Sequence, residues 1–434
     1  MDAAPAPRRR MHAGVRHPAT HPAARRLALV RILVYASWLA ALRPAEVLHY
    51  CLYGPALSRP PGLWAHLIDH LHAAPPVVRI LYAAFVPACV LAMLGVRPVL
   101  SQAVVVVAGG ALLTIPQFFG KVVHHNHLLW FALVLLVSPC ADAIAPDAAS
   151  RPAKPAIAYR LPLLFIILLT GVAYFFPGVW KCVHVGTEWL KPSNQVGILH
   201  AKWAELGATP SLRGDRFPVF CSLAAAFVLV FELAFLPLAL IGPRTRAALI
   251  ACGLVFHAGV LAVMKIRLWH LAAGYAALPL RRQRAPNIPR ARARLRPVVL
   301  VGSVLVVGNV IDGVLERDDW PFGLYPTFAH EAGPTMETAF LIFETPGGES
   351  TRTQWDLARH APPERTSRTY DMLLHPPPGR SREDTARALA GVWRSLDPAL
   401  AAATYVRVER VTIPTDPDVG LEPVRREVVS RVAR

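Results

Sequence analysis

The chain has 434 residues, of which 54% are hydrophobic and only 17% are charged, whereas a soluble globular domain carries charge on about a quarter of its residues. With a mean hydropathy of +0.38, this composition excludes a disordered chain, a collagen and a small disulfide-stabilised scaffold, and it indicates a polytopic membrane protein in contact with the lipid bilayer. The formal net charge of +18 comes largely from arginines that cluster between apolar runs, which is how membrane proteins set their orientation, so we expect no nucleic-acid partner.

Residues 1–26 are polar, proline-rich and basic, and they predict a disordered tail. Nine apolar runs follow, and each is a candidate membrane span. Several are shorter than the ~20 residues that an untilted span needs, so their helices must extend into the flanking sequence. The runs are 27–42, 78–94, 100–118, 127–137, 161–177, 217–241, 247–265, 266–280 and 297–311.

The basic residues between these runs predict the orientation of the chain. If the tail is cytoplasmic, Arg97 and the loops 141–160, 242–246 and 281–296 all fall on the cytoplasmic side, and the last of them alone contains seven arginines. Omitting the run 266–280 would move that loop outside, against the positive-inside rule, so we keep this run as a short span. The prediction is a multi-pass protein of the bacterial inner membrane, with a cytoplasmic N-terminus and an extracytoplasmic C-terminal domain.

Beyond about residue 312 the chain becomes polar and proline-rich. Segments 338–346 and 403–414 alternate as β-strands do, and 383–400 carries its apolar residues on one side of a helix. The aromatic residues of 320–328 fit an interfacial belt or a lid over the bundle. The fold class is therefore an α-helical membrane bundle of about nine spans with a small C-terminal α+β domain. The predicted parts are a tail (1–26), a transmembrane bundle (27–280), a basic cytoplasmic loop (281–296), a ninth transmembrane helix (297–311) and the α+β domain (312–434).

Ionisable side chains are informative in spans because each costs about 2.5–3.5 kcal/mol at mid-helix. Glu232 lies near the middle of the sixth run and His257 near the middle of the seventh, so both are predicted to face the bundle interior. They fit either a structural hydrogen-bond network or a functional site. Arg31 lies near the inner end of the first run, from where it can extend to the lipid headgroups.

A second group of polar residues lies where two runs end on the predicted outer side. A lysine directly after an aromatic helix end is partly desolvated, which favours the neutral amine and makes it usable as a base. The alternative for Lys181 is an interfacial anchor beside Trp180. The group consists of Lys121, His124, His125, Asn126 and His127 before the fourth run, and Lys181, Cys182, His184 and Glu188 after the fifth.

The histidines do not follow a metal-binding motif. His125 and His127 are two residues apart, and no HExxH or CxxC pattern accompanies them, so no metal site is predicted. Among the six cysteines, Cys51 and Cys182 both fall on the predicted outer side, and the sequence leaves open whether they pair.

Five segments, in this order, resemble the HTTM (horizontally transferred transmembrane) domain, which is the membrane domain of vitamin K-dependent gamma-carboxylases and of many bacterial proteins. The resemblance covers about residues 25–280. The segments are LALVRILVYASWL, HNHLLWFALVLLVSPCADAIAPD, YRLPLLFIILLTGVAYFFPGVWK, FELAFLPLAL and FHAGVLAVMKIRLWHLAAGYAALPL.

The resemblance implies a quinone site. In the carboxylases a lysine deprotonates a reduced quinone of the vitamin K or menaquinone type, oxygen adds, and the strong base that results removes a proton from a peptide glutamate, which then captures carbon dioxide. The resemblance places Lys181 at the catalytic lysine and His127 at a histidine that assists it. The residues expected to line the substrate or quinone pocket are His257, Glu232, Asn126 and Trp180.

The sequence departs from the carboxylases where they carry a lysine before the catalytic one, because that position is Trp180 here. A short α+β domain also replaces the large region that binds the substrate propeptide. The predicted function is a quinone-dependent, gamma-carboxylase-like enzyme that modifies an exported peptide or protein at the outer face. The alternatives are a non-catalytic membrane partner for the maturation, export or immunity of a secreted peptide, and a transporter or proton relay through Glu232 and His257.

Overall fold

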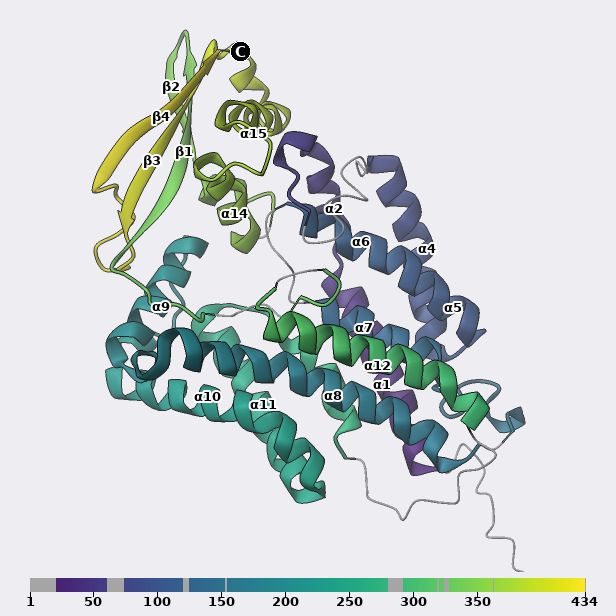
Figure 1. The fold of residues 1–434 in the computed structure, drawn as a ribbon. Coiled ribbons are helices and arrows are strands. Elements are labelled where there is room, and N and C mark those ends of the chain that lie inside the picture. The colour runs from purple at the N-terminus through teal and green to yellow at the C-terminus, as the bar shows by residue number, and fades with distance from the viewer. Residues whose placement is uncertain are drawn as a thin grey trace, which may run out of the picture.

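A computed structural model describes residues 21–60, 74–119, 125–152, 154–279, 292–317, 320–323, 328–361 and 363–433. The described chain is mostly helical and ends in a small antiparallel sheet, which packs at one end of the helices (Figure 1). The predicted tail is too long at its C-terminal end, since helix α1 (Pro22–Ala41) already begins at Pro22. Proline fits the first helical position because an N–H group there would have no hydrogen-bond partner within the helix, so nothing is lost by its absence.

Six described helices are long and apolar enough to cross a membrane, and this makes the chain an integral membrane protein by length and composition. A seventh arises if α1 and the segment Pro44–Leu52, bent by 47° against it, count as one span. The six are α4 (Pro75–Leu94), the helix Pro98–Phe118, the helix Ala156–Leu190 that starts with α8 (Ala156–Trp180), α10 (Pro218–Ile241), α11 (Pro243–Met264) and Leu295–Val314 within α12 (Arg292–Val314).

The helix Pro98–Phe118 is built from four consecutive parts, and only two of them are α-helical. The middle part is a single π-helical turn, a form that usually occurs as a short bulge within an α-helix. The parts are α5 (Pro98–Val104), the π-turn Val105–Gly109, α6 (Gly110–Thr114) and the 3-10 turn Ile115–Phe118.

Two predicted spans take other forms. The fourth run forms α7 (Asn126–Leu136), whose 11 residues reach only ~16 Å of a hydrocarbon core about 30 Å thick. The eighth run, 266–280, is not an α-helix over its described part but a 3-10 helix, η10 (Trp269–Ala277). Protein covers part of this 3-10 helix, since Gly274 packs against Thr170 and Phe131. The count of nine spans stays a prediction.

Helix α8 is the centre of the bundle. It runs antiparallel to α10, since Gly178 meets Glu232 while the earlier Gly171 meets Leu236. A Cβ atom at Gly171 would lie 2.6 Å from Leu236, so glycine is needed for this close approach. Helix α12 runs parallel to α8, and Gly313 lies against Phe176.

The loops predicted to be cytoplasmic meet at one end of this bundle. Arg151, before α8, donates to the carbonyl of Gly95, which ends α4. Because α10 is antiparallel to α8, the loop between α10 and α11 lies at the same end. Of the predicted basic loop 281–296, residues 292–296 belong to α12 and residues 281–291 lie outside the described chain. The described basic loops therefore share one end, as the orientation argument requires.

Arg31 does not extend to the headgroups. Its side chain is fully buried and donates to the carbonyls of Cys140 at 2.9 Å and Met93 at 3.0 Å, and also to that of Ile144. These carbonyls lie at the end of α4 and in the loop after α7, where helix ends leave acceptors without intrahelical partners. Satisfying them explains why a buried arginine is tolerated here.

The C-terminal domain has the predicted α+β form. Its sheet has the order β2-β1-β3-β4 and contains β1 (Thr335–Thr345), β2 (Gly348–Arg352), β3 (Tyr405–Pro414) and β4 (Arg425–Ala433), all antiparallel to their neighbours. Helices α14 (Pro363–Leu374) and α15 (Arg382–Leu396) lie beside the sheet (Figure 1). Helix α15 buries Ala386, Leu389, Val392 and Trp393, the face that the sequence predicts.

The domain is attached to the bundle through α9 (Pro192–Leu206), a helix that the apolar runs do not reveal. Trp355 donates its indole N–H to the carbonyl of Ala204 at 2.8 Å, and the guanidinium of Arg213 binds the Asp418 carboxylate at 2.8 Å. The domain therefore sits at the end of the bundle where α8 ends and α10 begins, opposite the basic loops (Figure 1).

Candidate functional site

Lys181 and Glu232 form a buried pair between α8 and α10. Lys181 opens a π-helical turn (Lys181–Val185) that follows α8, and its Nζ lies 2.7 Å from both carboxylate oxygens of Glu232. The two residues are only 2% and 4% exposed. Nζ also lies 5.1 Å from the centre of the Trp189 ring, within range of a cation–π contact. Lys181 is therefore not an anchor in the headgroup region.

The short contact between the two buried groups lets a proton move between the amine and the carboxylate. Desolvating an ion costs several kcal/mol, so a buried ion pair is always in competition with the neutral pair in which the proton has moved to the carboxylate. At 2.7 Å this transfer needs no rearrangement. A group that replaces Glu232 beside the amine could receive or release that proton.

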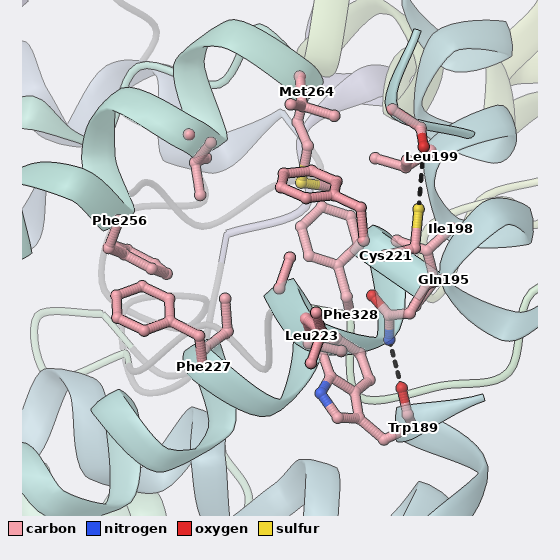
Figure 2. Close-up of a pocket in the computed structure, with 18 of the residues that line it drawn as sticks. Trp189, Gln195, Ile198, Leu199, Cys221, Leu223, Phe227, Phe256, Met264 and Phe328 are labelled. Atoms are coloured by element: carbon pink, nitrogen blue, oxygen red, sulfur yellow. Dashed lines mark hydrogen bonds between the residues drawn. The ribbon is translucent and has the colours of Figure 1, made fainter. Parts of the chain in front are cut away.

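An apolar cavity of about 480 Å³ opens beside the pair. Lys181 and Glu232 contribute to its wall, and the rest comes mainly from α9, α10, α11 and Phe328. Figure 2 shows Phe227 and Phe256 together on one side of this cavity and Trp189 with Gln195 at another. Cavities of this size and character bind small apolar molecules with a few polar anchoring groups.

The polar end of the cavity has unused hydrogen-bonding capacity. Trp189 is 4% exposed, and its indole Nε1 has no hydrogen-bond partner among the described residues. The side-chain amide nitrogen of Gln195 donates to the main-chain carbonyl of Trp189. The side-chain oxygen of Gln195 therefore points away from that contact (Figure 2). A buried N–H without a partner costs free energy, so a ligand group that accepts from it would be favoured.

One side of the cavity borders surface that faces lipid in a membrane. Phe220 and Leu223 of α10 and Val255 of α11 line the cavity and are 54%, 65% and 63% exposed. Large apolar side chains exposed on spanning helices contact acyl chains. A molecule with a hydrophobic tail can therefore reach the cavity from the bilayer.

The structure does not bring the other predicted site residues to this cavity. Trp180 points to α12, where its Nε1 donates to the carbonyl of Gly313 at 3.1 Å. His127 is buried on α7 with its ring against Phe131, and Asn126 accepts from Gln117 at 3.3 Å. Among the described contacts, none joins His127 to Lys181. The expected lysine–histidine pair is thus replaced by a lysine–glutamate pair, because α10 packs directly on the end of α8.

His257 belongs to a separate network. Its Nε2 lies 2.9 Å from the hydroxyl of Tyr174 and 3.1 Å from that of Tyr275, and the two hydroxyls lie 2.6 Å apart. These contacts join α11, α8 and η10. His257 therefore takes part in a buried hydrogen-bond network, and it is not a described lining residue of the apolar cavity.

The other predicted site residues lie apart from the apolar cavity or outside the described residues. His184 is exposed and pairs with Glu316 at 3.1 Å, while Lys121 and His124 lie outside the described residues. Cys51 and Cys182 are both free, so they do not form a disulfide. No group of three or more potential metal ligands occurs within the described ranges.

Sequence reasoning missed the contribution of α9 and of the turn before it. Gln195, Ile198 and Leu199 line the cavity, and so does Trp189. The signal was available: Pro192 occupies the first helical turn and Gly207, with φ +61°, ends the helix. These are standard start and stop residues. The low apolar content between them hid the helix from a search for spans.

Comparisons with protein-family models, with curated proteins and with solved structures find no match to this chain.

Proposed function

We propose that this chain is an HTTM-like membrane enzyme that binds a reduced quinone in the apolar cavity and uses Lys181 as a base to modify an exported peptide or protein. The observation that carries the proposal is the position of a fully buried amine, paired with a carboxylate, on the wall of an apolar cavity that borders the lipid-facing surface. An ion pair that only stabilises the fold does not require a ligand-sized cavity beside it. A quinone with an isoprenoid tail needs an apolar cavity for the tail and a polar group for the ring.

The residues fit such a ligand. The apolar walls of α10 and α11 suit an isoprenoid tail, and Lys181, Gln195 and the unpaired N–H of Trp189 suit a ring that carries two oxygens. A reduced quinone would supply acidic hydroxyls and the electrons for chemistry with oxygen. Glu232 accepts from the Lys181 amine, so it is positioned to take the proton that Lys181 must lose before the amine can act as a base.

The bundle also keeps water away from the amine. Lys181 is 2% exposed, and Phe328, from the segment between α12 and the sheet, closes one side of the cavity. Excluding water keeps a strong base from being quenched before it meets its substrate. The short α+β domain, on the same end as Lys181, is the natural surface for presenting a peptide. We infer that this end is extracytoplasmic, in the bacterial inner membrane, because the basic loops lie at the other end.

The test uses the purified protein in detergent micelles with reduced menaquinone. Binding is followed by quenching of tryptophan fluorescence, and turnover by incorporation of labelled bicarbonate into peptides of co-purified exported proteins. Lys181→Ala and Lys181→Arg are expected to abolish turnover, since alanine has no amine and an arginine is never neutral, while the apolar walls of the cavity still hold the isoprenoid tail. Full turnover by both variants would refute the role of Lys181 as a base.

A glycine variant tests the cavity separately. Gly259 lines it, and a Cβ added there meets no atom within 4 Å, so Gly259→Leu adds bulk beside the cavity and should weaken quinone binding. Gly391→Leu, on the exposed face of α15, adds the same side chain elsewhere and should bind as the wild type does. Unchanged binding by Gly259→Leu would remove the quinone from this cavity and favour a non-catalytic partner of a secreted peptide.

A further inference from the structure

A second cavity, of about 710 Å³, lies between the bundle and the C-terminal domain. Its described walls come from the end of α1, α2 (Pro44–His49), the end of α9, the segment between α11 and η10, and the turn after α13 (Gln354–Leu357). No described residue lines both this cavity and the apolar one. It is therefore a separate space that the proposed function does not use.

Positive charge dominates this second cavity. Five cationic side chains but only one carboxylate, that of Glu46, line its described part. Glu46 is 3.5 Å from Arg43, and so its charge is already engaged. The five cations are Arg43, Lys202, Lys265, Arg267 and Arg359.

Two of these cations have no ion-pair partner among the described residues. Lys265 and Arg267 follow the end of α11, and neither lies within ion-pair distance of a described acidic group. Lys202 is 5% exposed and binds Glu205 at 2.8 Å, but Glu205 also accepts from Ser367. Unpaired like charges around one space repel each other, so an anion between them would stabilise the arrangement.

One residue that lines the cavity, His270, has a buried polar atom without a partner among the described residues. His270 is 3% exposed, its Nδ1 makes no hydrogen bond within the described chain, and its Nε2 lies 3.1 Å from Nε2 of His125. If His125 donates in that contact, Nδ1 of His270 carries the proton and is a free donor. A donor on a residue that lines the same space as several cations suits a ligand with many acceptor oxygens.

The cations also lie at the end where the positive-inside rule gives no reason for them. The basic loops Arg97, 141–160 and 242–246 occupy the opposite end of the bundle. The positive-inside rule therefore explains the positive charges of those loops but not the positive charges around the cavity. We propose that this cavity binds a phosphate-bearing ligand, either the headgroup of an anionic lipid or a free phosphorylated molecule, between the bundle and the C-terminal domain.

The test measures two probes on the full-length protein. Sodium pyrophosphate is titrated by calorimetry into protein held in a neutral detergent, and phosphatidylglycerol is offered in nanodiscs against phosphatidylcholine, with retained lipid counted by native mass spectrometry. Binding of pyrophosphate identifies a free anion site, and selective retention of phosphatidylglycerol identifies a headgroup site. Either result supports the proposal, and failure of both probes to bind overturns it.

Paired variants locate the binding. Lys265→Gln with Arg267→Gln removes two exposed charges from the cavity and should weaken binding about tenfold or more, because each charge-assisted hydrogen bond contributes substantially. Lys191→Gln with Arg216→Gln removes two exposed charges from the same end of the bundle outside the cavity and should leave affinity unchanged. Equal weakening by both pairs would reduce the effect to net charge and refute the site.

A single variant on the other wall tests the part played by the domain. Arg359 lies in the turn after α13 and its side chain is 79% exposed, so Arg359→Gln will not disturb folding. It should weaken binding to a smaller extent, and unchanged binding would overturn the claim that the domain contributes to the site.

Discussion

The loss of stability in a Glu232→Gln variant tests whether the Lys181–Glu232 pair is buried. Glu232→Gln removes the carboxylate and leaves the ammonium with one amide oxygen in a site where it is 2% exposed. Breaking a buried ion pair in this way costs about 3–5 kcal/mol, because the remaining charge keeps its desolvation penalty. An exposed ion pair costs at most about 1 kcal/mol to break. The two expectations do not overlap.

The double variant Lys181→Met with Glu232→Leu removes both charges of the pair at once. Both charges are replaced by apolar side chains of similar size, so the protein should recover to near wild-type stability or exceed it by about 1–4 kcal/mol. Activity should stay absent in the double variant although its stability returns.

The assay is the free energy of unfolding in detergent, measured by titrating sodium dodecyl sulfate into dodecyl-maltoside micelles and following tryptophan fluorescence. Glu188→Gln is the matched control, since Glu188 forms an exposed pair with Lys191 at the same end of the bundle. A loss below about 1 kcal/mol for Glu232→Gln, equal to the control, would refute the buried pair and with it the proton-handling argument.

Three further predictions concern other parts of the molecule. Arg31→Met should lower the melting temperature clearly, because the carbonyls of Cys140 and Met93 lose a buried donor; a melting curve equal to wild type would contradict that role. The Arg213 guanidinium lowers the pKa of Asp215 from 3.8 to about 2, so its stabilisation is complete above pH 3.8 and is lost as the pH falls towards 2; melting curves of Asp215→Asn should therefore fall less over that range than those of the wild type. Cys182 is exposed, whereas Cys140 is buried, so a membrane-impermeant maleimide should label Cys182 in intact cells if this end is extracytoplasmic, and labelling only after lysis would reverse the orientation.

Much of the fold follows from local patterns. Most apolar runs became helices that start a few residues earlier than predicted, as α4 and α11 do, because an apolar run marks only the buried centre of a helix. The alternation in 338–346 and 403–414 became β1 and β3. The run 266–280 forms a 3-10 helix rather than an α-helix over its described part, which hydropathy does not distinguish, because both a spanning helix and a protein-covered 3-10 segment are buried.

The candidate site divides in the same way. Position in the chain was enough to mark Glu232 as an ionisable group that lipid cannot explain, because a charge in the middle of a span is costly. It marked Lys181 only as a residue at the outer end of a span, where it could be either a base or an interfacial anchor. Their contact with each other, 51 residues apart, depends on which faces of α8 and α10 meet, and a glycine at 178 permits that approach. The cavity beside them and the basic cavity under the C-terminal domain have no local signal at all, since each is space left between elements that are distant in sequence and is defined only once those elements have packed.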